Sequence, residues 1–373
     1  MSKKVKKNSS AFKHIINVTV VKKISHEINH FYPPFNKKKF LNLCSQLEEL
    51  ELKARVLHIT AALKVCLPQN YETSISVIIS VMNNKNLKGF ELWPFSEYIS
   101  QFGLEDFPES FAAMHILTQH FTSEFAVRPF FEKDLSLSLK YFSKWLKDPS
   151  QHVRRWLSEG SRPLLPWGKR VTHFIKNPTC TQKILDYLKY DDELYVRKSV
   201  ANHLNDLSKI DPSLTIETIK KWEKNSSKAN LQKILWIKKH ALRTLIKKGN
   251  QQALQLMGVS EQLQIITSKI KLNQNNYKLS DKLEFSFEIT SHAKINQTLI
   301  IDYVIHFVKS NGQLAAKVFK LKTLKLAPNQ KIQIKKTHSL RPITTMQYYR
   351  GDQRIQIQIN GSIVAQKNWY LQI

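Results

Sequence analysis

The spacing of apolar residues changes once along the chain, at about residue 264. From about residue 36 to 257, apolar side chains recur three or four residues apart, and glycine and proline stand mainly at breaks. This spacing gathers apolar residues on one face of a helix. Two such stripes are formed by Leu43, Leu47, Leu50 and Ala54 and by Ile184, Leu185 and Leu188. The pattern predicts an all-α region over residues 1–263.

A sequence repeat is visible in the second part of this helical region. Asp148-Pro149 is followed by Val153-Arg154, and Asp191-Asp192 is followed by Val196-Arg197. Ile237-Lys238 begins a third copy, so that the offsets are 43 and 41 residues. These offsets are typical of HEAT-like helical pairs, which stack into a superhelix with a concave binding face.

Beyond residue 264 the spacing of apolar residues becomes two, as in strands with one buried face. The alternating segments are 282–290, 298–308, 314–326, 331–340 and 353–359. Asn311-Gly312 and Asn360-Gly361 are typical of hairpin turns. Roughly seven short strands predict an immunoglobulin-like sandwich over residues 264–373. This region holds no cysteine pair, which excludes the antibody type.

The net charge of +29 indicates an anionic partner, most simply nucleic acid. From residue 264 onward, 17 lysines and arginines stand against 5 acidic residues. We therefore interpret the sandwich as a second, DNA-binding clamp on the phosphate backbone. For any single lysine, the alternative is that it only solvates an exposed strand edge.

The composition also indicates where the protein acts. Cys44, Cys66 and Cys180 are isolated and lack metal-site spacing, which indicates reduced thiols in an intracellular protein. The first ten residues are basic like a signal peptide, but no small-residue cleavage site follows. No apolar run approaches the ~18 residues of a membrane span. We expect a soluble, cytoplasmic, nucleoid-associated monomer without metal or cofactor.

Arginine is concentrated around the segment 152–167, HVRRWLSEGSRPLLPW. Five of the eleven arginines fall within 43 residues, namely Arg128, Arg154, Arg155, Arg162 and Arg170. Because arginine binds phosphate oxygens in pairs, all five are candidate phosphate contacts. At the repeat positions Arg154 and Arg197, the alternative is an ion pair with the preceding aspartate, which we favour for Arg197.

Glu159 stands out among the acidic residues because it precedes Gly160, where a helix is expected to end. A negative charge at a helix C-terminus is unfavourable by a few tenths of a kcal/mol or more. Neighbouring arginines keep such a carboxylate ionised. This placement favours a functional role, the stabilisation of positive charge that develops in a transition state.

Glu124 and Asp206 are further acidic candidates, and each has a structural alternative. Glu124 is expected in a core helix, where Ser123 would cap and Arg128 would pair with it at the i, i+4 spacing. Asp206 is otherwise a solvent-exposed helix residue followed by Lys209. The sequence alone leaves these alternatives open.

Four stretches resemble the AlkC-type DNA alkylation repair glycosylases: 52–63, 90–104, 123–130 and 152–167. Members of this family cleave the N-glycosidic bond of cationic N-methylated bases such as 3-methylcytosine and 3-methyladenine, with 1-methyladenine in the same class. The resemblance implies helical repeats followed by an immunoglobulin-like domain. It also implies a monofunctional enzyme of base excision repair that acts on double-stranded DNA carrying alkylated bases.

The resemblance further implies a role for each site residue. A cationic base is a good leaving group, so the enzyme has to stabilise an oxocarbenium-like sugar and position water. Glu159, Glu124 and Asp206 would supply carboxylates, and Trp167 would pack against the deoxyribose. The phosphates around the lesion would be held by Arg128, Arg154, Arg155, Arg162 and Arg170. Leu164 and Leu165 depart from the family pattern, in which a further basic residue is common.

Related helical-repeat glycosylases are thought to work without flipping the base, and the sequence shows no compact aromatic pocket motif. Two other readings remain open. One is a non-catalytic scaffold that recognises damaged or bent duplex by charge and shape. The other is RNA binding, for which no stacking-aromatic motif is present.

Overall fold

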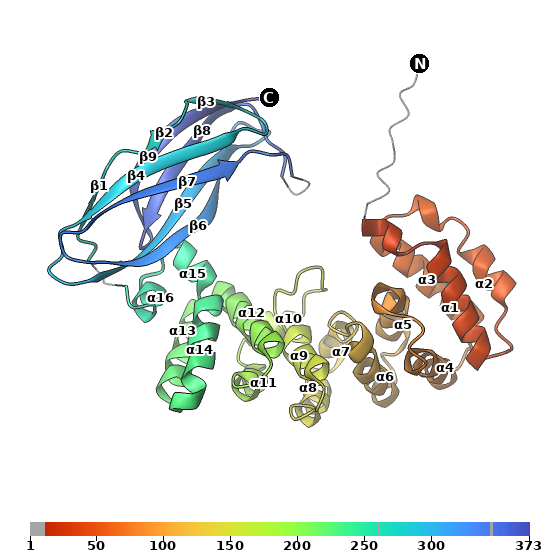
Figure 1. The fold of residues 1–373 in the computed structure, drawn as a ribbon. Coiled ribbons are helices and arrows are strands. Elements are labelled where there is room, and N and C mark those ends of the chain that lie inside the picture. Colours follow the sequence, from red (N-terminus) through yellow and green to blue (C-terminus); the bar gives the residue numbers. More distant parts are fainter. Residues whose placement is uncertain (1–11, 260–261, 344–345) are drawn as a thin grey trace, which may run out of the picture. The chain divides into compact units, whose positions relative to one another are not determined.

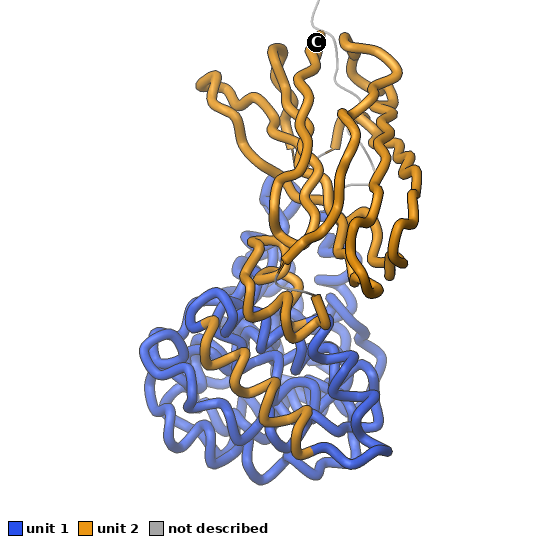
Figure 2. The backbone as a smooth tube through the Cα atoms, turned by 90° about the vertical axis from the view of Figure 1, so that its left-hand side faces the viewer, with its two compact units in different colours: residues 1–211, 226–240 blue, residues 212–225, 241–373 orange. Residues whose placement is uncertain are grey.

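The computed structural model describes residues 12–259, 262–343 and 346–373. In these residues helices precede strands, which confirms the predicted fold class (Figure 1). The chain divides into two compact units, Met1–Asp211 with Ser226–His240 and Pro212–Asn225 with Ala241–Ile373 (Figure 2). The basic first ten residues, whose part in DNA binding the sequence leaves open, lie outside the described residues.

The helices of the first unit follow one another in chain order as short packed elements (Figure 1). The α-helices are α1 (Val18–Phe31), α2 (Lys37–Leu43), α3 (Leu52–Cys66), α4 (Tyr71–Asn83), α5 (Trp93–Phe102), α6 (Phe107–His120), α7 (Arg128–Lys133), α8 (Leu135–Lys144), α9 (Gln151–Gly160), α10 (Thr172–Lys176), α11 (Gln182–Leu188), α12 (Leu194–Ile210), α13 (Pro212–Lys224), α14 (Lys228–Ala241), α15 (Arg243–Lys247) and α16 (Gln251–Leu256). Three 3-10 turns accompany them: η1 (Phe12–Ile15), η2 (Leu47–Glu49) and η3 (Gly89–Leu92). None of the described helices is long and apolar enough to cross a membrane.

Two details of the predicted helices are corrected. Helix α1 precedes the expected start at residue 36, because the Asn17 side chain accepts the backbone N–H groups of Thr19 and Val20 and caps it. The stripe from Leu43 to Ala54 is not one helical face, since it is divided among α2, η2 and α3. The second stripe, 184–188, lies on α11 and is buried as expected.

The predicted repeat recurs as equivalent hydrogen bonds at the starts of α9 and α12. Arg154 donates from Nη1 to the carbonyls of Asp148 and Pro149, at 2.8 and 3.0 Å. Arg197 donates from Nη1 to the carbonyls of Asp191 and Asp192, at 2.6 and 2.8 Å. The repeat arginine therefore closes the turn before its own helix. We expected Arg197 to pair with the carboxylate of the preceding aspartate. It binds the main-chain carbonyls of Asp191 and Asp192 instead.

The strands form two facing sheets. They are β1 (Ile265–Thr267), β2 (Lys271–Leu272), β3 (Asn276–Lys278), β4 (Lys282–Ser291), β5 (Gln297–Val308), β6 (Leu314–Leu326), β7 (Lys331–Ser339), β8 (Gly351–Ile359) and β9 (Ser362–Gln372). One sheet has the order β1-β4-β2 with β7 also paired to β4, and the other has the order β3-β9-β8-β5-β6. Asn360-Gly361 joins β8 to β9 with φ of 50° and 83°, as a type I′ hairpin requires.

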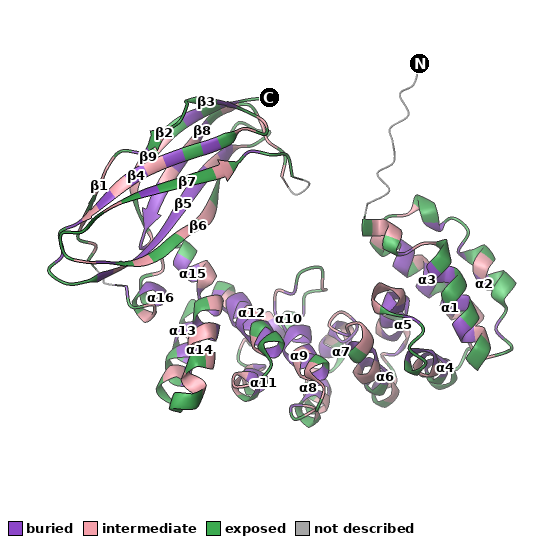
Figure 3. Cartoon of the chain, in the orientation of Figure 1, coloured by how far each residue is buried: buried purple, intermediate pink, exposed green. Residues whose placement is uncertain are grey.

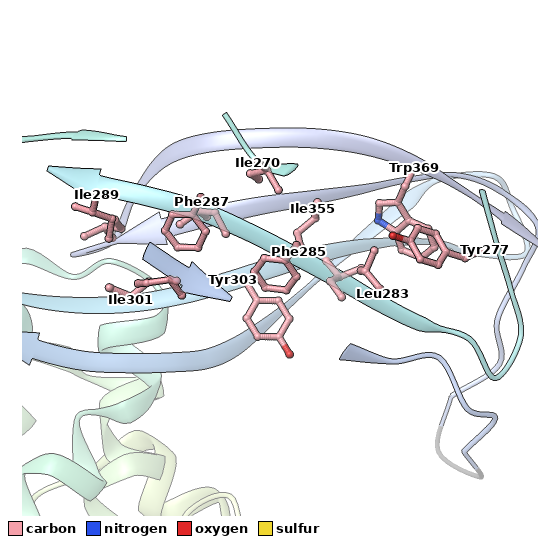
Figure 4. Packing of buried hydrophobic residues seen from close by; sticks show 14 of the residues in the cluster. Ile270, Tyr277, Leu283, Phe285, Phe287, Ile289, Ile301, Tyr303, Ile355 and Trp369 are labelled. Atoms are coloured by element: carbon pink, nitrogen blue, oxygen red, sulfur yellow. The ribbon is translucent and has the colours of Figure 1, made fainter. Parts of the chain in front are cut away.

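The core of the sandwich is made by the alternate residues that face between the sheets (Figure 3). Phe285 and Phe287 of β4 meet Ile355 of β8, and Tyr277 packs edge-on against Trp369 (Figure 4). These side chains bury their apolar surface almost completely. In β4 and in most of β8 the period of two seen in the sequence is thus the period of burial, whereas most of β5 is buried on both faces.

The second unit also contains helices α13, α15 and α16. Gln358 of β8 donates to the carbonyl of Lys247 in α15 at 3.1 Å. A Cβ added to Gly361 would lie 2.5 Å from the Cα of Gly249, so these two turns pack backbone to backbone. The predicted border at residue 264 marks the start of the strands, but it cuts through this compact unit.

Candidate active site

A cavity of about 380 Å³ lies in the first unit, between the segment 152–167 and the loop before α7. Its walls are Phe90, Trp93, Phe121, Thr122, Glu124, Phe125, Glu159, Arg162, Leu165, Pro166 and Trp167. The structure therefore brings two of the predicted carboxylates, Glu124 and Glu159, to one cavity with Trp167. Leu165 and Pro166 add apolar surface to its wall.

Glu159 lies in the last turn of α9, as predicted, and only 6 % of its surface is exposed. Oε1 accepts a hydrogen bond from Arg162 Nη1 at 2.6 Å, and Oε2 accepts one from Ser199 Oγ at 2.7 Å. Arg155 Nη2 lies 3.5 Å from Oε1. Burial would raise the pKa of Glu159, but Arg155, Arg162 and the Ser199 hydrogen bond outweigh it and hold that pKa below the ordinary 4.5. The carboxylate is therefore ionised at neutral pH.

Glu124 lies in a turn before α7 and not in the helix that was expected. Ser123 does not cap that helix, because its Oγ donates to the carbonyl of Met114 at 2.7 Å. Glu124 Oε2 accepts hydrogen bonds from Arg155 Nη1 and, at 3.1 Å, from Thr122 Oγ1. The expected i, i+4 pair with Arg128 is absent among the described residues. The partner of Glu124 is Arg155, which comes from the next repeat.

Asp206 lies on α12 behind Arg162 and is 1 % exposed, so the expectation of a solvent-exposed position is wrong. Its Oδ2 accepts a hydrogen bond from Arg162 Nε at 2.8 Å, and its Oδ1 accepts one from Lys209 Nζ at 3.1 Å. Asp206 is not among the residues that line the cavity. It contacts the site through Arg162, whose pKa is raised because Asp206 and Glu159 outweigh its burial.

These side chains form a continuous alternation of charge, here called the charge network: Glu124, Arg155, Glu159, Arg162, Asp206 and Lys209. Arg155 also lies over the ring of Tyr195, with Cζ 5.4 Å from its centroid. Each carboxylate of the network has a cationic neighbour, which offsets the unfavourable burial of its charge. The network spans the loop before α7, α9 and α12 and fixes them to one another.

Arg128 is fully buried, which corrects the expected phosphate contact, because no surface of its side chain can reach a phosphate. Nη1 donates to the carbonyls of Gly160 and Arg162, both at 2.9 Å, and Nε donates to the carbonyl of Lys169. Burial, with nearby Arg162, lowers the pKa of Arg128 to about 10, so it stays charged at neutral pH. Arg128 thus ties together the turn 160–169.

Trp167 is the exposed tip of this turn, with 76 % of its surface accessible. Its φ of 63° lies in the left-handed region, which is costly for a bulky side chain. Next to it, a Cβ on Gly168 would lie 2.9 Å from Leu165 and 3.1 Å from Arg128. The close approach to Arg128 therefore requires glycine here. Strained backbone held by its surroundings is typical of functional sites.

The remaining arginines are placed differently from one another. Arg154 donates to both carboxylate oxygens of Asp191, at 2.7 and 3.1 Å, and joins two repeats. Arg155 and Arg162 bind carboxylates of the charge network, and Arg155 is the more exposed of the two. Arg170 is exposed to solvent. No group of His, Cys, Asp or Glu suited to a metal ion occurs among the described residues.

Sequence reasoning identified Trp167 but missed the other aromatic residues of the cavity, Phe90, Trp93, Phe121 and Phe125. Phe90 lies 6.0 Å from Trp93 between ring centroids, and Trp93 stacks on Phe125 at 6.4 Å. They come from segments 90–93 and 121–125, which are distant in sequence, so no compact motif marks them. The available signal was that both segments fall in or beside stretches that resemble the glycosylase family. Ser199, which lies 40 residues from its partner Glu159, carried no signal at all.

Three comparisons place the chain among known proteins. Residues 267–373 match the family model described as "Uncharacterised protein YhaZ, C-terminal Ig-like domain". The Uncharacterized protein YhaZ of Bacillus subtilis (strain 168) is 36 % identical over 354 residues, covering 94 % of this chain and 96 % of that protein. The Pseudomonas fluorescens alkylpurine DNA glycosylase AlkC, bound to DNA containing an abasic site analog, superposes with a TM-score of 0.90. That similarity has 34 % identity and covers 97 % of this chain and 100 % of the other.

Proposed function

Because the chain belongs to the family of AlkC-type DNA alkylation repair glycosylases, we propose that it is a DNA glycosylase of base excision repair. Its substrates are cationic N-methylated bases in double-stranded DNA, in the class of 3-methylcytosine, 3-methyladenine and 1-methyladenine. The observation that carries this proposal is the buried, ionised Glu159 in the wall of a cavity that five aromatic side chains also line.

The reaction is the hydrolysis of the N-glycosidic bond. The bond between C1′ and the base nitrogen breaks, and its electron pair neutralises the cationic base, so no general acid is needed. Positive charge develops on the sugar, where an ionised carboxylate stabilises it. Glu159 has this role, because arginines on two sides hold it ionised and Ser199 fixes its second oxygen.

Glu124 is suited to position the attacking water. One of its oxygens, Oε2, is held by Arg155 and Thr122, whereas no described residue donates to Oε1. That free oxygen can accept a hydrogen bond from water and take up the proton as water adds to C1′. Two carboxylates with different environments can thus take different roles, one electrostatic and one as base.

Trp167 packs against the deoxyribose in this proposal, since its ring is exposed at the edge of the cavity. We propose that the lesion stays in the base stack, as in related helical-repeat glycosylases. Asp206 then acts by orienting Arg162 against Glu159. The exposed Arg170 remains as the contact for phosphates around the lesion, because Arg154, Arg155 and Arg162 are bound to carboxylates and Arg128 is buried.

The DNA partner contacts the sandwich as well in this proposal. Lysines are exposed along β6 and β7, including Lys322, Lys325, Lys335 and Lys336. Each of these strands pairs on one side only within its sheet, so its outer edge and its lysines face solvent. The proposed setting is the nucleoid, with the protein acting as a monomer without metal or cofactor.

The decisive experiment compares two substitutions that each remove one buried negative charge. Glu159→Gln removes the proposed catalytic carboxylate, and Asp191→Asn removes the carboxylate that binds Arg154 outside the cavity. Release of methylated base from duplex DNA should fall about 100-fold or more with Glu159→Gln. DNA binding should be retained, because the substitution adds no negative charge.

Asp191→Asn is the matched control. It should lower the stability of the fold but leave the rate of base release by the folded protein nearly unchanged. A protein that binds methylated duplex but frees no base would instead be a non-catalytic scaffold. If both variants lost base release equally, the effect of Glu159→Gln would come from damage to the fold and not from loss of a catalytic carboxylate.

A further inference from the structure

A second cavity, of about 510 Å³, lies beside the first in the same unit. The two cavities share three aromatic side chains, Trp93, Phe125 and Trp167, as a common wall. Neither Glu124 nor Glu159 lines the second cavity. Its volume lies within the range of about 300 to 1,000 Å³ usual for small-ligand sites. The proposed hydrolysis leaves this space without a use.

Three kinds of group line this second cavity. Its aromatic wall offers π faces on which a base can stack, whatever its identity. Lys53 and Lys169 are exposed cations at its edge, and neither has an acidic partner among the described residues. Glu97 also lines the cavity, with Trp93 Nε1 3.4 Å from its Oε1 and no described donor to its Oε2. Lysines bind phosphate, and a free carboxylate oxygen accepts amino hydrogens.

We propose that the second cavity binds a mononucleotide unit. Its base stacks against Trp93, Phe125 and Trp167, its amino group donates to Glu97, and its phosphate lies at Lys53 and Lys169. The unit is either an unpaired nucleotide of a DNA strand or a free nucleotide. This site goes beyond the proposed hydrolysis, because binding here requires no bond cleavage and no methylated base.

Binding of AMP to the full-length protein tests the site. Trp93 and Trp167 line the cavity, so their fluorescence reports AMP directly, and calorimetry gives the affinity independently. Ser100→Phe fills the cavity from α5 without touching the catalytic one, and Ser76→Phe adds the same ring to an exposed position on α4. AMP affinity should fall about tenfold or more with Ser100→Phe, since a stacked base contributes roughly 1–3 kcal/mol. It should not change with Ser76→Phe.

Glu97→Gln provides a second variant that leaves the cavity open. It should weaken AMP binding several-fold and leave ribose 5-phosphate binding unchanged, because only the base has an amino group. AMP binding that is absent, or equal in wild type, Ser100→Phe and Glu97→Gln, overturns the proposal. These readouts use no methylated DNA, so their failure is separate from failure of the glycosylase proposal.

Duplexes with and without one unpaired adenosine distinguish the two sources of the nucleotide. Tighter binding of the bulged duplex that is lost in Ser100→Phe assigns the site to a nucleotide within the strand. Equal binding of both duplexes, together with AMP binding that Ser100→Phe removes, assigns it to a free nucleotide.

Discussion

Around the cavity of the first unit, charged side chains are buried and paired, whereas on the sandwich edges of the second unit they lie in solvent. Arg128, Arg155 and Arg162 each donate hydrogen bonds to carbonyls or carboxylates of the protein itself. Lys322 and Lys325 of β6 are exposed, and the core beneath their strand is apolar (Figure 3, Figure 4). The cationic residues behind the net charge of +29 are thus of two kinds, buried arginines that are paired within the protein and exposed lysines that face solvent.

The difference between the two regions suggests different roles for their charges: buried pairs position the side chains of the candidate site, and exposed lysines provide affinity for DNA. A buried ion pair contributes little net stability, but removing one partner is costly because the other charge stays buried. An exposed lysine contributes little to stability but can neutralise a DNA phosphate. Arg128, Arg155 and Arg162, which stand out in the sequence, therefore hold the candidate site together, and the less conspicuous lysines are the better candidates for DNA affinity.

The largest expected effect follows from substitution of Arg128. Arg128→Met leaves three main-chain carbonyls of the turn 160–169 without a donor, and we expect a loss of stability of about 3–5 kcal/mol by denaturant unfolding. Arg128→Lys keeps the charge but cannot reach all three carbonyls, so it should recover only part of the loss. Arg354→Met is the control in the sandwich, where Asn368 is the only hydrogen-bond partner of the partly exposed guanidinium among the described residues, and it should cost about 0.5 kcal/mol or less. Equal losses at both positions would contradict the comparison.

The lysines of the sandwich provide the converse test. Replacing Lys322, Lys325, Lys335 and Lys336 by glutamine should leave the melting temperature nearly unchanged. If all four contact phosphates, the slope of log affinity for DNA against log salt should become shallower by about 0.9 for each contact. The matched variant with four arginines keeps the charges and should keep the slope. A glutamine variant with the wild-type slope would remove β6 and β7 from the DNA contact.

The sequence alone was sufficient to predict the features that depend on the spacing of nearby residues. The helical and strand regions, the VR repeat and the Asn360-Gly361 turn follow from spacing and from dihedral preference, and the structure confirms each of them. Glu159 was recognisable because its charge opposes its helix end, a conflict that one segment reveals alone. The sequence did not show that α13, α15 and α16 pack with the sandwich, since this packing depends on contacts such as Gln358 with Lys247.

The partners of the site residues needed the tertiary structure. Arg128 and Arg155 both look like phosphate ligands in sequence, yet one is buried among carbonyls and the other pairs with Glu124 across 31 residues. The aromatic wall is likewise assembled from three segments, 90–93, 121–125 and the turn that carries Trp167. Composition indicated that charges and rings are present, but only packing decides which of them meet.

The smallest expected effect tests the charge network at Ser199, for which we propose a positioning role toward Glu159. Ser199→Ala removes the hydrogen bond to Oε2, one of the interactions that hold the pKa of Glu159 low, while burial continues to raise that pKa. Glu159 has to be ionised, so base release is present above its pKa and is lost as the pH falls through it. The acid limb of the rate against pH should therefore move to higher pH, with a rate loss at pH 7.5 of about tenfold or less. Ser208→Ala removes an equally buried hydroxyl from the same helix, whose one hydrogen bond to a described residue goes to the Asn205 carbonyl at 2.8 Å, and it should leave the limb in place. If Ser199→Ala lowered the rate equally at all pH values, Ser199 would support the fold of α12 and not the charge of Glu159.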